Sequence, residues 1–209
     1  MNETSRRWRV ALAGAAVGAL AVAWPAGPAT AGTIEGTPGA DTLIGTNRDD
    51  LLVGRGGNDH LEGRDGEDRI FGGRGGDTIL LGAGGVDVEK LDLVDTAHGG
   101  PGIDLVRGGP GPDEIFGDPG NDVLFGGARN DVIHGGRGDD RISGGSGIDD
   151  VRPGKGADLV DLGRGADYVF LGNDGVADLV VCGPGDDYVD RDEVDPQDEF
   201  RGCETVVRP

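Results

Sequence analysis

Hydrophobic positions recur every nine residues between residues 36 and 170, and a polar, glycine-rich stretch separates each from the next. The chain reads as fifteen frames of the form G-G-x-G-x-D-x-U-x, and position eight is Leu, Ile or Val in all but one, where Ala97 stands. Each hydrophobic residue is the centre of a segment such as Thr78-Ile79-Leu80, whose alternate side chains would point to opposite faces of a strand. A fixed period of this kind is the signature of a repeat architecture. The pattern therefore predicts short stacked strands that share one thin core.

The predicted core takes one aliphatic side chain from each frame. Its members are Leu43, Leu52, Leu61, Ile70, Ile79, Val88, Val106, Ile115, Leu124, Ile133, Ile142, Val151, Val160 and Val169. Because they share one position of the repeat, we expect them all to point the same way.

Two polar columns keep the same phase as the core. Position six is Asp in every frame but one, which has Val86, and position four is Gly except at Arg48, Leu93 and Arg129. Glycines permit backbone angles that are closed to other residues, and they leave carbonyl oxygens uncovered. Calcium takes six to eight oxygen ligands, commonly carboxylates and backbone carbonyls. The turns therefore predict calcium sites in which Asp side chains and carbonyls of neighbouring turns meet.

With these columns the chain resembles the repeats-in-toxin, or hemolysin-type calcium-binding, family over nearly all of its length after residue 31. Residues 72–80 and 135–143 are complete copies of the motif. The resemblance implies an all-β fold, a right-handed parallel β-roll (β-solenoid) in which two nonapeptides form each coil of eighteen residues. It also implies that the first six residues of each nonapeptide form a calcium-binding turn and the last three a short strand.

Coils of this length would separate the aspartates into two edges of the roll. One edge would carry Asp41, Asp59, Asp77, Asp95, Asp113, Asp131, Asp149 and Asp167. The other edge would carry Asp50, Asp68, Asp104, Asp122, Asp140 and Asp158. The sites expected to bind best pair the aspartates 41/59, 59/77, 113/131, 131/149, 149/167, 50/68, 104/122, 122/140 and 140/158. Arg48 and Arg129 bring positive charge into two turns, so we expect weaker sites there.

We predict one acidic side chain from most turns as a metal ligand. The predicted ligands are Asp41, Asp50, Asp59, Asp68, Asp77, Asp104, Asp113, Asp122, Asp131, Asp140, Asp149, Asp158, Asp167 and Asp187. Roughly nine calcium ions would add about +18 of charge to a chain whose net charge is −20. Because the carboxylates repel one another and aromatic residues are only 4% of the chain, ion binding should supply most of the folding free energy. We expect the chain to be disordered without calcium.

Residues 81–98 break the motif and yet keep the count, since they make up one full coil of eighteen. Residues 84–87 look like a turn displaced by one residue, and residues 90–95 alternate polar and apolar side chains as a strand does. One interpretation is a degenerate coil that keeps the stack continuous and binds less calcium. The other is a protruding loop that contacts a partner.

The C-terminal part of the chain departs from the strict period. Two residues are inserted in 171–181, and one further turn ends at Asp187. Cys182 and Cys203 are the only cysteines, and in an exported chain they are expected to form a disulfide. A zinc site or a redox pair would need partners or a spacing that these cysteines lack. We predict that residues 182–209 form the last turn and a disulfide-closed cap over a roll that spans residues 32–181.

The N-terminus has the pattern of a secretory signal peptide over residues 1–31. Arg6, Arg7 and Arg9 form a basic start, and the apolar run 10–23 is short for a membrane span. Small residues precede the expected cleavage point after Ala31. An uncleaved anchor is the alternative. The arginine pair also resembles a twin-arginine signal, but Arg9 stands where that motif prefers an apolar residue, which favours the general secretory route.

Catalytic chemistry finds little support in the sequence. His60, His98 and His134 have no metal-ligand spacing and are expected on strand surfaces, and Ser143 and Ser146 lack the context of a nucleophile. The repeats leave no stretch of catalytic-domain size. We therefore expect no enzyme. The strongly acidic balance also argues against nucleic acid as a partner.

The sequence leaves several extracellular roles open. A secreted calcium-binding module of this kind would bind a polysaccharide, a cell-wall component or a protein, or it would serve as a matrix element or calcium buffer. A hydrolase or lyase that acts on acidic extracellular polysaccharide is the alternative. A contiguous stripe of Arg and Tyr on one sheet would favour binding, and scattered positions would favour a passive role. The residues that decide this are Arg69, Arg107, Arg141, Arg152, Tyr168 and Tyr188.

Overall fold

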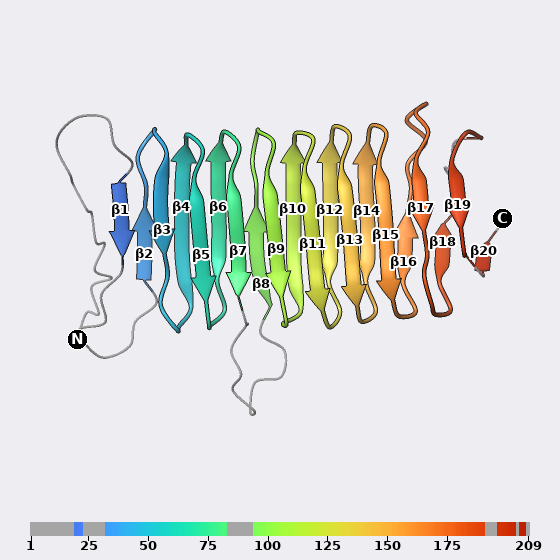
Figure 1. Ribbon diagram of the computed structural model, residues 1–209, viewed down its shortest axis with the longest axis horizontal. Helices are drawn as coiled ribbons and strands as arrows, with labels where there is room; N and C mark the ends of the chain where they lie inside the picture. Colours follow the sequence, from blue (N-terminus) through green and yellow to red (C-terminus); the bar gives the residue numbers. More distant parts are fainter. Residues whose placement is uncertain (1–18, 23–31, 83–93, 191–195, 204, 208–209) are drawn as a thin grey trace, which may run out of the picture.

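The protein is an elongated stack of short parallel strands (Figure 1). The computed structural model describes residues 19–22, 32–82, 94–190, 196–203 and 205–207. Within these ranges there is no helix, so none is long and apolar enough to cross a membrane. The chain alternates between two sheets of ten strands each, and every strand pairs in parallel with the strand two places later. This confirms the predicted all-β, two-strand-per-coil β-roll.

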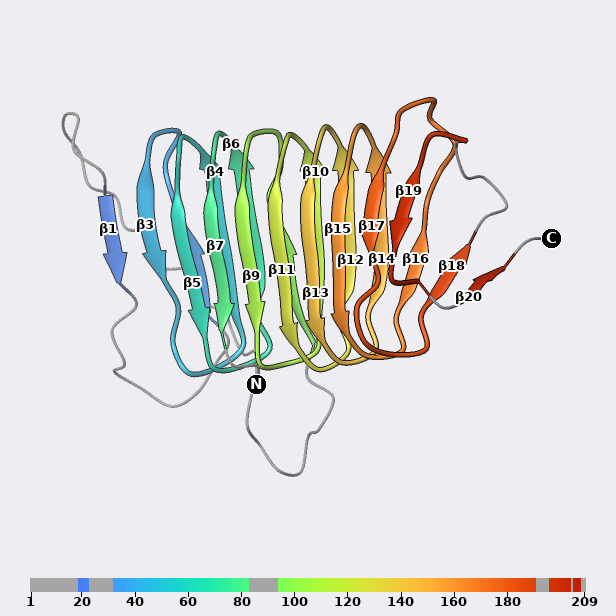
Figure 2. The same cartoon turned by 45° about the vertical axis from the view of Figure 1, so that its right-hand side comes forward.

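The two sheets take the odd-numbered and the even-numbered strands, and the stack runs in chain order from one end to the other (Figures 1 and 2). The odd sheet consists of β1 (Ala19–Val22), β3 (Asp41–Ile44), β5 (His60–Arg64), β7 (Thr78–Gly82), β9 (Leu105–Gly109), β11 (Val123–Ala128), β13 (Arg141–Ser146), β15 (Leu159–Arg164), β17 (Leu179–Val181) and β19 (Glu199–Arg201). The even sheet consists of β2 (Gly32–Glu35), β4 (Asp50–Gly56), β6 (Arg69–Arg74), β8 (Asp95–His98), β10 (Asp113–Pro119), β12 (Val132–Arg137), β14 (Asp150–Lys155), β16 (Tyr168–Phe170), β18 (Tyr188–Asp190) and β20 (Thr205–Val207).

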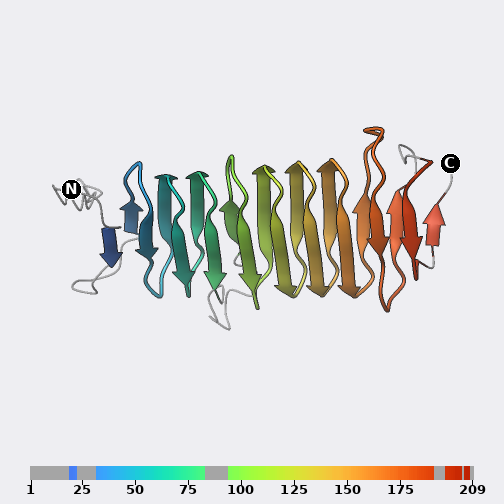
Figure 3. The same ribbon diagram turned by 45° about the horizontal axis from the view of Figure 1, so that its top comes forward.

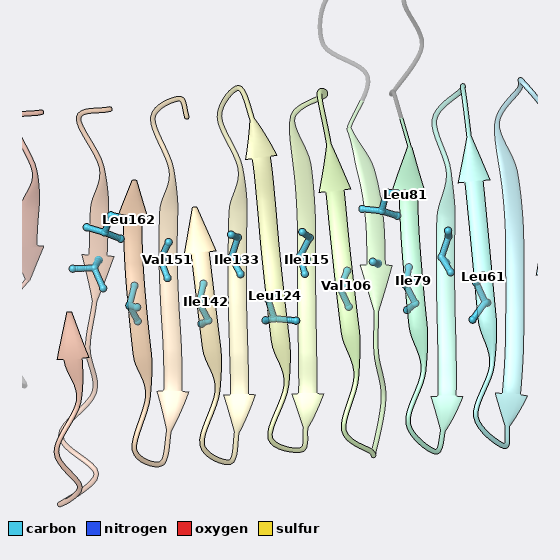
Figure 4. Close-up of a cluster of buried hydrophobic side chains, with 14 of the residues drawn as sticks. Leu61, Ile79, Leu81, Val106, Ile115, Leu124, Ile133, Ile142, Val151 and Leu162 are labelled. Atoms are coloured by element: carbon cyan, nitrogen blue, oxygen red, sulfur yellow. The ribbon is translucent and has the colours of Figure 1, made fainter. Parts of the chain in front are cut away.

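One hydrophobic core runs along the stack between the two sheets (Figure 4). Every predicted core residue that the structure describes is at most 3% exposed, and Ala97 joins them. Val88 lies outside the described residues. Leu81 and Leu162 add side chains at position one of the repeat, where most frames have Gly. The prediction of a single thin aliphatic core is therefore confirmed.

The strands from β1 to β15 are longer than the three residues that the family resemblance implied, and those from β16 to β20 have this length. β10 is seven residues long, and its side chains alternate in burial so that Asp113, Ile115 and Gly117 all face the interior. The ladder therefore continues through the glycine at position one. The chain turns only after the next position, where Gly136 on the neighbouring β12 has a φ of 119°. A left-handed backbone of this kind suits Gly and ends the strand.

The interruption contributes half a coil instead of the full coil that we predicted. Thr78 of β7 pairs with Leu105 of β9, which is 27 residues later, whereas His60 and Thr78 are 18 apart. β8 is the one described strand that the chain adds between β7 and β9, and it pairs with both β6 and β10. The stack is therefore continuous (Figure 3). Residues 83–93, with the displaced turn and most of the predicted strand, lie outside the described residues.

Both ends of the chain add strands to the stack. β1 pairs with β3, so part of the predicted signal peptide adjoins the roll, and its removal after residue 31 stays a prediction. At the other end β19 pairs with β17, and β20 pairs with β18. Cys182 and Cys203 form the predicted disulfide, with Cα atoms 5.0 Å apart. The strands β18, β19 and β20 thus continue the two sheets, and the role of residues 182–209 as a cap stays a prediction.

Candidate metal centre

The aspartates of position six line the interior of the turns. They face the interior like the core aliphatics, because the Asp of position six and the aliphatic of position eight are two positions apart on an alternating strand. All fourteen predicted ligands are at most 5% exposed. Asp95 and Asp178 share this burial, at 0% and 5%. Such burial is rare for carboxylates unless they are paired or bind a metal.

In most of these carboxylates one oxygen accepts a hydrogen bond from a backbone N–H of a neighbouring coil. The N–H of Asp122 donates to Oδ1 of Asp140 at 2.8 Å, and the N–H of Asp140 donates to Oδ1 of Asp158 at the same distance. Equivalent bonds or strand pairs run through both columns. One column is Asp41, Asp59, Asp77, Asp104, Asp122, Asp140, Asp158 and Asp178. The other is Asp50, Asp68, Asp95, Asp113, Asp131, Asp149, Asp167 and Asp187.

These columns correct the predicted edges. Asp41, Asp59 and Asp77 share their edge with Asp104 and its successors, not with Asp95. The edges exchange because the interruption adds half a coil, which shifts every later turn to the opposite side. All nine predicted pairs are nonetheless neighbours, since none of them crosses the interruption. Their role as calcium ligands stays a prediction.

The second oxygen of most of these carboxylates has no hydrogen-bond partner in the structure. Oδ2 lacks a partner in Asp59, Asp68, Asp77, Asp104, Asp113, Asp122, Asp131, Asp140, Asp149, Asp158, Asp167 and Asp187. In Asp113 both carboxylate oxygens lack one. A buried carboxylate in this condition costs several kcal/mol unless a cation compensates it.

Carbonyl oxygens from the next coil lie beside these free carboxylate oxygens. A Cβ atom added to Gly126 would lie 2.5 Å from Oδ2 of Asp131 and 2.6 Å from the carbonyl oxygen of Gly144. The two oxygens thus lie side by side against Gly126, so close that no side chain fits at position one. Calcium takes carboxylate and backbone carbonyl oxygens as ligands. The donor set therefore fits calcium, and it repeats from coil to coil.

The electrostatics of the turns point the same way. Burial, more than any neighbouring charge, raises the pKa of Asp68, Asp113 and Asp131 to about 8. It raises the pKa of Asp122 to about 7, and there the charges of Asp104 and Asp140 add to the effect. Without a counter-ion the charged form of each group is therefore strongly disfavoured.

Side chains alone do not complete a metal shell here. Among the described residues no group of three or more His, Cys, Asp or Glu side chains converges on one point. The carbonyls of the glycine turns must therefore supply most of the oxygens. This explains why glycines accompany each Asp through the repeat.

The two arginines that replace the glycine of position four, Arg48 and Arg129, are both exposed. Arg129 has a φ of 84°, so its backbone still takes the left-handed form, and its N–H donates to the carbonyl of Ser146 at 2.6 Å. That these turns bind calcium more weakly stays a prediction.

Two buried aspartates were absent from the predicted ligands. Asp95 has the right phase, but it follows the broken part of the motif. Asp178 precedes Leu179-Val180-Val181 and so keeps the D-x-U-x order, but the two inserted residues shift it out of frame. The N–H of Asp158 donates to Oδ1 of Asp178 at 2.9 Å, 20 residues away, so the column accommodates the insertion.

The comparison with protein families agrees with this geometry. The family described as RTX calcium-binding nonapeptide repeat (4 copies) matches residues 30–47, 35–68, 44–79, 98–128, 116–151 and 154–175, which together exceed half of the chain. The chain belongs to this RTX repeat family. Its repeats are thus calcium-binding repeats, and the unpaired oxygens of the turns are where calcium fits. No curated protein matches the chain by sequence.

Proposed function

We propose that this RTX chain is a secreted, calcium-dependent binding module that recognises an extracellular polysaccharide through the outer face of its even sheet. The calcium dependence rests on the columns of buried aspartates with an unpaired oxygen. Secretion is supported by the signal-like N-terminus and by the disulfide, since disulfides persist mainly in oxidising compartments. Extracellular modules typically bind calcium with dissociation constants of ~10⁻⁴–10⁻³ M, and we expect the same range here.

The binding surface is a row of stacked side chains on the even sheet. Phe71, His98, Phe116 and His134 stack in order, with ring centroids 5.2, 4.4 and 4.8 Å apart and planes within 10° of parallel. Arg152 continues the row, with Nη1 3.5 Å from Nε2 of His134. Its guanidinium carbon lies 4.9 Å from the ring centroid of Phe170. We call these six residues, on β6, β8, β10, β12, β14 and β16, the aromatic row.

The residues of the expected Arg and Tyr stripe do not all lie on one sheet. Arg107 and Arg141 lie on the odd sheet, whereas Arg69, Tyr168 and Tyr188 lie on the even sheet. The arginines are therefore divided between the faces. The tyrosines do form a pair beside the aromatic row, with ring centroids 5.7 Å apart.

Aromatic side chains gather on one face of the molecule. Three of the five phenylalanines and both tyrosines lie on the even sheet, whereas the odd sheet has Phe125 and the packed Phe200. Aromatic residues and Arg are enriched where proteins bind partners. A row that repeats at the strand spacing of ~4.8 Å suits an extended, repeating partner such as a polysaccharide chain.

Polysaccharide binding can be measured on a glycan array in calcium. The substitutions Phe116→Ser and His134→Ser remove the centre of the aromatic row, and Phe125→Ser on the odd sheet is the matched control. Phe125 is 37% exposed, and the guanidinium of Arg107 lies 5.4 Å from its ring centroid, so its setting is similar. We expect the row variant to lose binding and the control to keep it.

Two outcomes would contradict this proposal. If the calcium-loaded protein binds no glycan, a matrix element or calcium buffer becomes the better interpretation. Equal loss in both variants would mean that the aromatic row has no special role. The alternative of a hydrolase or lyase stays a hypothesis, which turnover of a polyuronate would test.

A further inference from the structure

We infer that removal of residues 1–31 creates an ion pair in the first coil, between the new α-ammonium group of Gly32 and the buried carboxylate of Asp50. The inference rests on the secretion in the proposed function, because only a cleaved chain has a charged nitrogen at residue 32. It gives Asp50, one of the predicted calcium ligands, a counter-ion that the chain itself supplies.

The first strand of the even sheet begins at the residue that follows the expected cleavage point (Figure 1). β2 starts at Gly32 and pairs with β4, so that Gly32 lies opposite Asp50. Ile34 belongs to the core and is 8% exposed. Glu35 forms an ion pair with Arg55 of β4 at 2.5 Å. Strand pairing, the core and this ion pair therefore all fix the position of Gly32 from its C-terminal side.

The backbone nitrogen of Gly32 takes a place that belongs to a turn aspartate in the regular coils. It donates to Oδ1 of Asp50 at 3.0 Å. One coil later the N–H of Asp50 donates in the same way to Oδ1 of Asp68 at 2.8 Å. Gly32 is thus the first member of this column, and it has no carboxylate of its own. In the cleaved chain its nitrogen is an ammonium group, so the bond becomes charge-assisted and roughly twice as strong.

The carboxylate of Asp50 is buried, and its other oxygen is already bound. Asp50 is 5% exposed, and Oδ2 accepts hydrogen bonds from the N–H and Oγ1 of Thr46 at 2.6 and 2.8 Å. Within the described part of the chain no Lys, Arg or His side chain forms an ion pair with it. The donors from Thr46 are neutral, and an opposite charge beside a carboxylate stabilises its charged form further. The ammonium group supplies that charge at Oδ1.

The same contact accounts for a glycine at residue 32. A Cβ added there would lie 2.8 Å from Oδ1 of Asp50, which is closer than a carbon atom can approach without a shift of the oxygen. The place of the cleavage is equally restricted. Since consecutive Cα atoms are about 3.8 Å apart, a chain that began one residue earlier would have its charge about that far from the carboxylate.

The aspartate on the opposite edge of the same coil is a matched control. Asp41 is 4% exposed, and Thr37 contacts its Oδ2 as Thr46 contacts that of Asp50. Oδ1 of Asp41 has no hydrogen-bond partner among the described residues. The nitrogen of Gly32 is bonded to Asp50, whereas Asp41 belongs to the other column. Cleavage should therefore affect only one of these two buried carboxylates.

The ion pair would couple export to the stability of the first coil. In the precursor the nitrogen of Gly32 is a neutral amide, and cleavage converts it into the counter-ion of Asp50. Because each coil of a solenoid packs on its neighbours, a more stable first coil stabilises the stack that begins on it. The processed protein is then more stable than the same coils with an N-terminal extension.

The test moves the charge by one residue. A Ser inserted between Ala31 and Gly32 leaves the signal sequence unchanged, but the processed chain then begins at the inserted Ser and residue 32 keeps a neutral amide. Mass spectrometry of the secreted proteins establishes where each chain begins. In saturating calcium we expect the insertion to raise the equilibrium constant of unfolding, measured in urea, by about fivefold or more, because the charge-assisted bond is lost.

A double-mutant cycle shows whether Asp50 is the partner of the ammonium group. Asp50→Asn removes the carboxylate charge, and Asp41→Asn removes the matched charge on the other edge. We expect the insertion to have little effect on the Asp50→Asn protein and its full effect on the Asp41→Asn protein. An equal effect of the insertion on both variants would contradict the ion pair.

The outcomes separate this inference from the proposed function. If the chain is not exported, the proposed secretion and the ion pair are both wrong. If the exported parent protein begins at another residue, or begins at Gly32 and is no more stable than the insertion variant, only the ion pair is wrong.

Discussion

The first two turns of the roll and the turns at its centre contain the same buried aspartate, but they satisfy it differently. In the second turn Thr46 stands at position two, and its N–H and Oγ1 lie 2.6 and 2.8 Å from Oδ2 of Asp50. Thr37 contacts Oδ2 of Asp41 in the same way in the first turn. In the central turn at residues 126–131 position two is Gly127, and Oδ2 of Asp131 has no partner. The threonines thus supply from the chain what a cation must supply elsewhere.

The difference shows that calcium dependence belongs to the whole turn and not to the aspartate alone. A hydroxyl at position two satisfies the carboxylate, and a glycine there leaves it open. Gly127 has a φ of 122°, and a Cβ there would clash with the carbonyl oxygen of Gly109, so a threonine does not fit this turn. The backbone of this turn therefore excludes the side chain that satisfies the carboxylate in the first two turns.

Blocking a central turn should have the largest effect. Gly126→Ala places a methyl group against Oδ2 of Asp131 and the carbonyl oxygen of Gly144, so it must displace two oxygens that we expect to bind calcium. We expect a loss of about 1–3 kcal/mol of stability from the clash alone, and a further loss of calcium binding at that turn. Urea unfolding in saturating calcium measures the loss of stability.

The matched control for that variant is Gly39→Ala in the first turn. The nearest atom to an added Cβ there is Oγ1 of Thr37 at 3.9 Å. We expect a change within about 0.5 kcal/mol. An equal loss in both variants would show that the two oxygens have no special role.

Asp131→Asn should have effects of opposite sign with and without calcium. In chelator above pH 8 it removes a buried charge whose Oδ2 lacks a partner, so the folded state should gain about 1–3 kcal/mol. In calcium it removes a ligand, so the protein should lose stability and need more calcium to fold. Unfolding followed by circular dichroism in chelator and in calcium measures both changes. A loss of stability in chelator would contradict the account.

Thr46→Gly should convert a self-satisfied turn into a calcium-dependent one. The substitution leaves Oδ2 of Asp50 without the hydroxyl of its present partner, at a cost of about 1 kcal/mol in chelator. In saturating calcium the cost should shrink. Thr42→Gly, on the outer face of β3, is the control that changes strand propensity without touching a carboxylate, and an equal calcium response in both would contradict the comparison.

Acid should act in opposite directions on the metal-free and calcium-loaded states. Burial raises the pKa of Asp131 from 3.8 to about 8, so protonation stabilises the metal-free fold below pH 4, and that stability is lost as the pH rises toward 8. Calcium needs the deprotonated carboxylate, so its affinity should fall between pH 8 and pH 6. Calcium titrations followed by circular dichroism at several pH values test both signs, and a midpoint independent of pH would contradict them.

The sequence predicted what depends on strict phase. The aspartate and aliphatic columns follow from the nine-residue period, and their burial at Asp122 and Leu124 is as expected. The disulfide followed from the cysteine count and the export signal. The two columns need only the repeat length and the alternation of side chains along a strand.

The rest depends on how coils meet, which the period does not encode. The exchange of edges after Asp77 and the meeting of Phe71 with His98 both result from the half coil at the interruption. Residues 81–98 are eighteen in number, so the sequence predicted a full coil there and not half a coil. The Thr46 contact was missed because a threonine at position two departs from the motif without breaking its phase.

The most direct test of the account is a calcium titration of the protein followed by circular dichroism, with magnesium as the control. Beside it stands a variant with Asp122→Ala and Asp140→Ala, which removes two adjacent carboxylates of one column. The account predicts a cooperative gain of β structure with calcium and not with magnesium, weakened in the variant. A protein that is already fully folded in chelator and does not respond to calcium would contradict it.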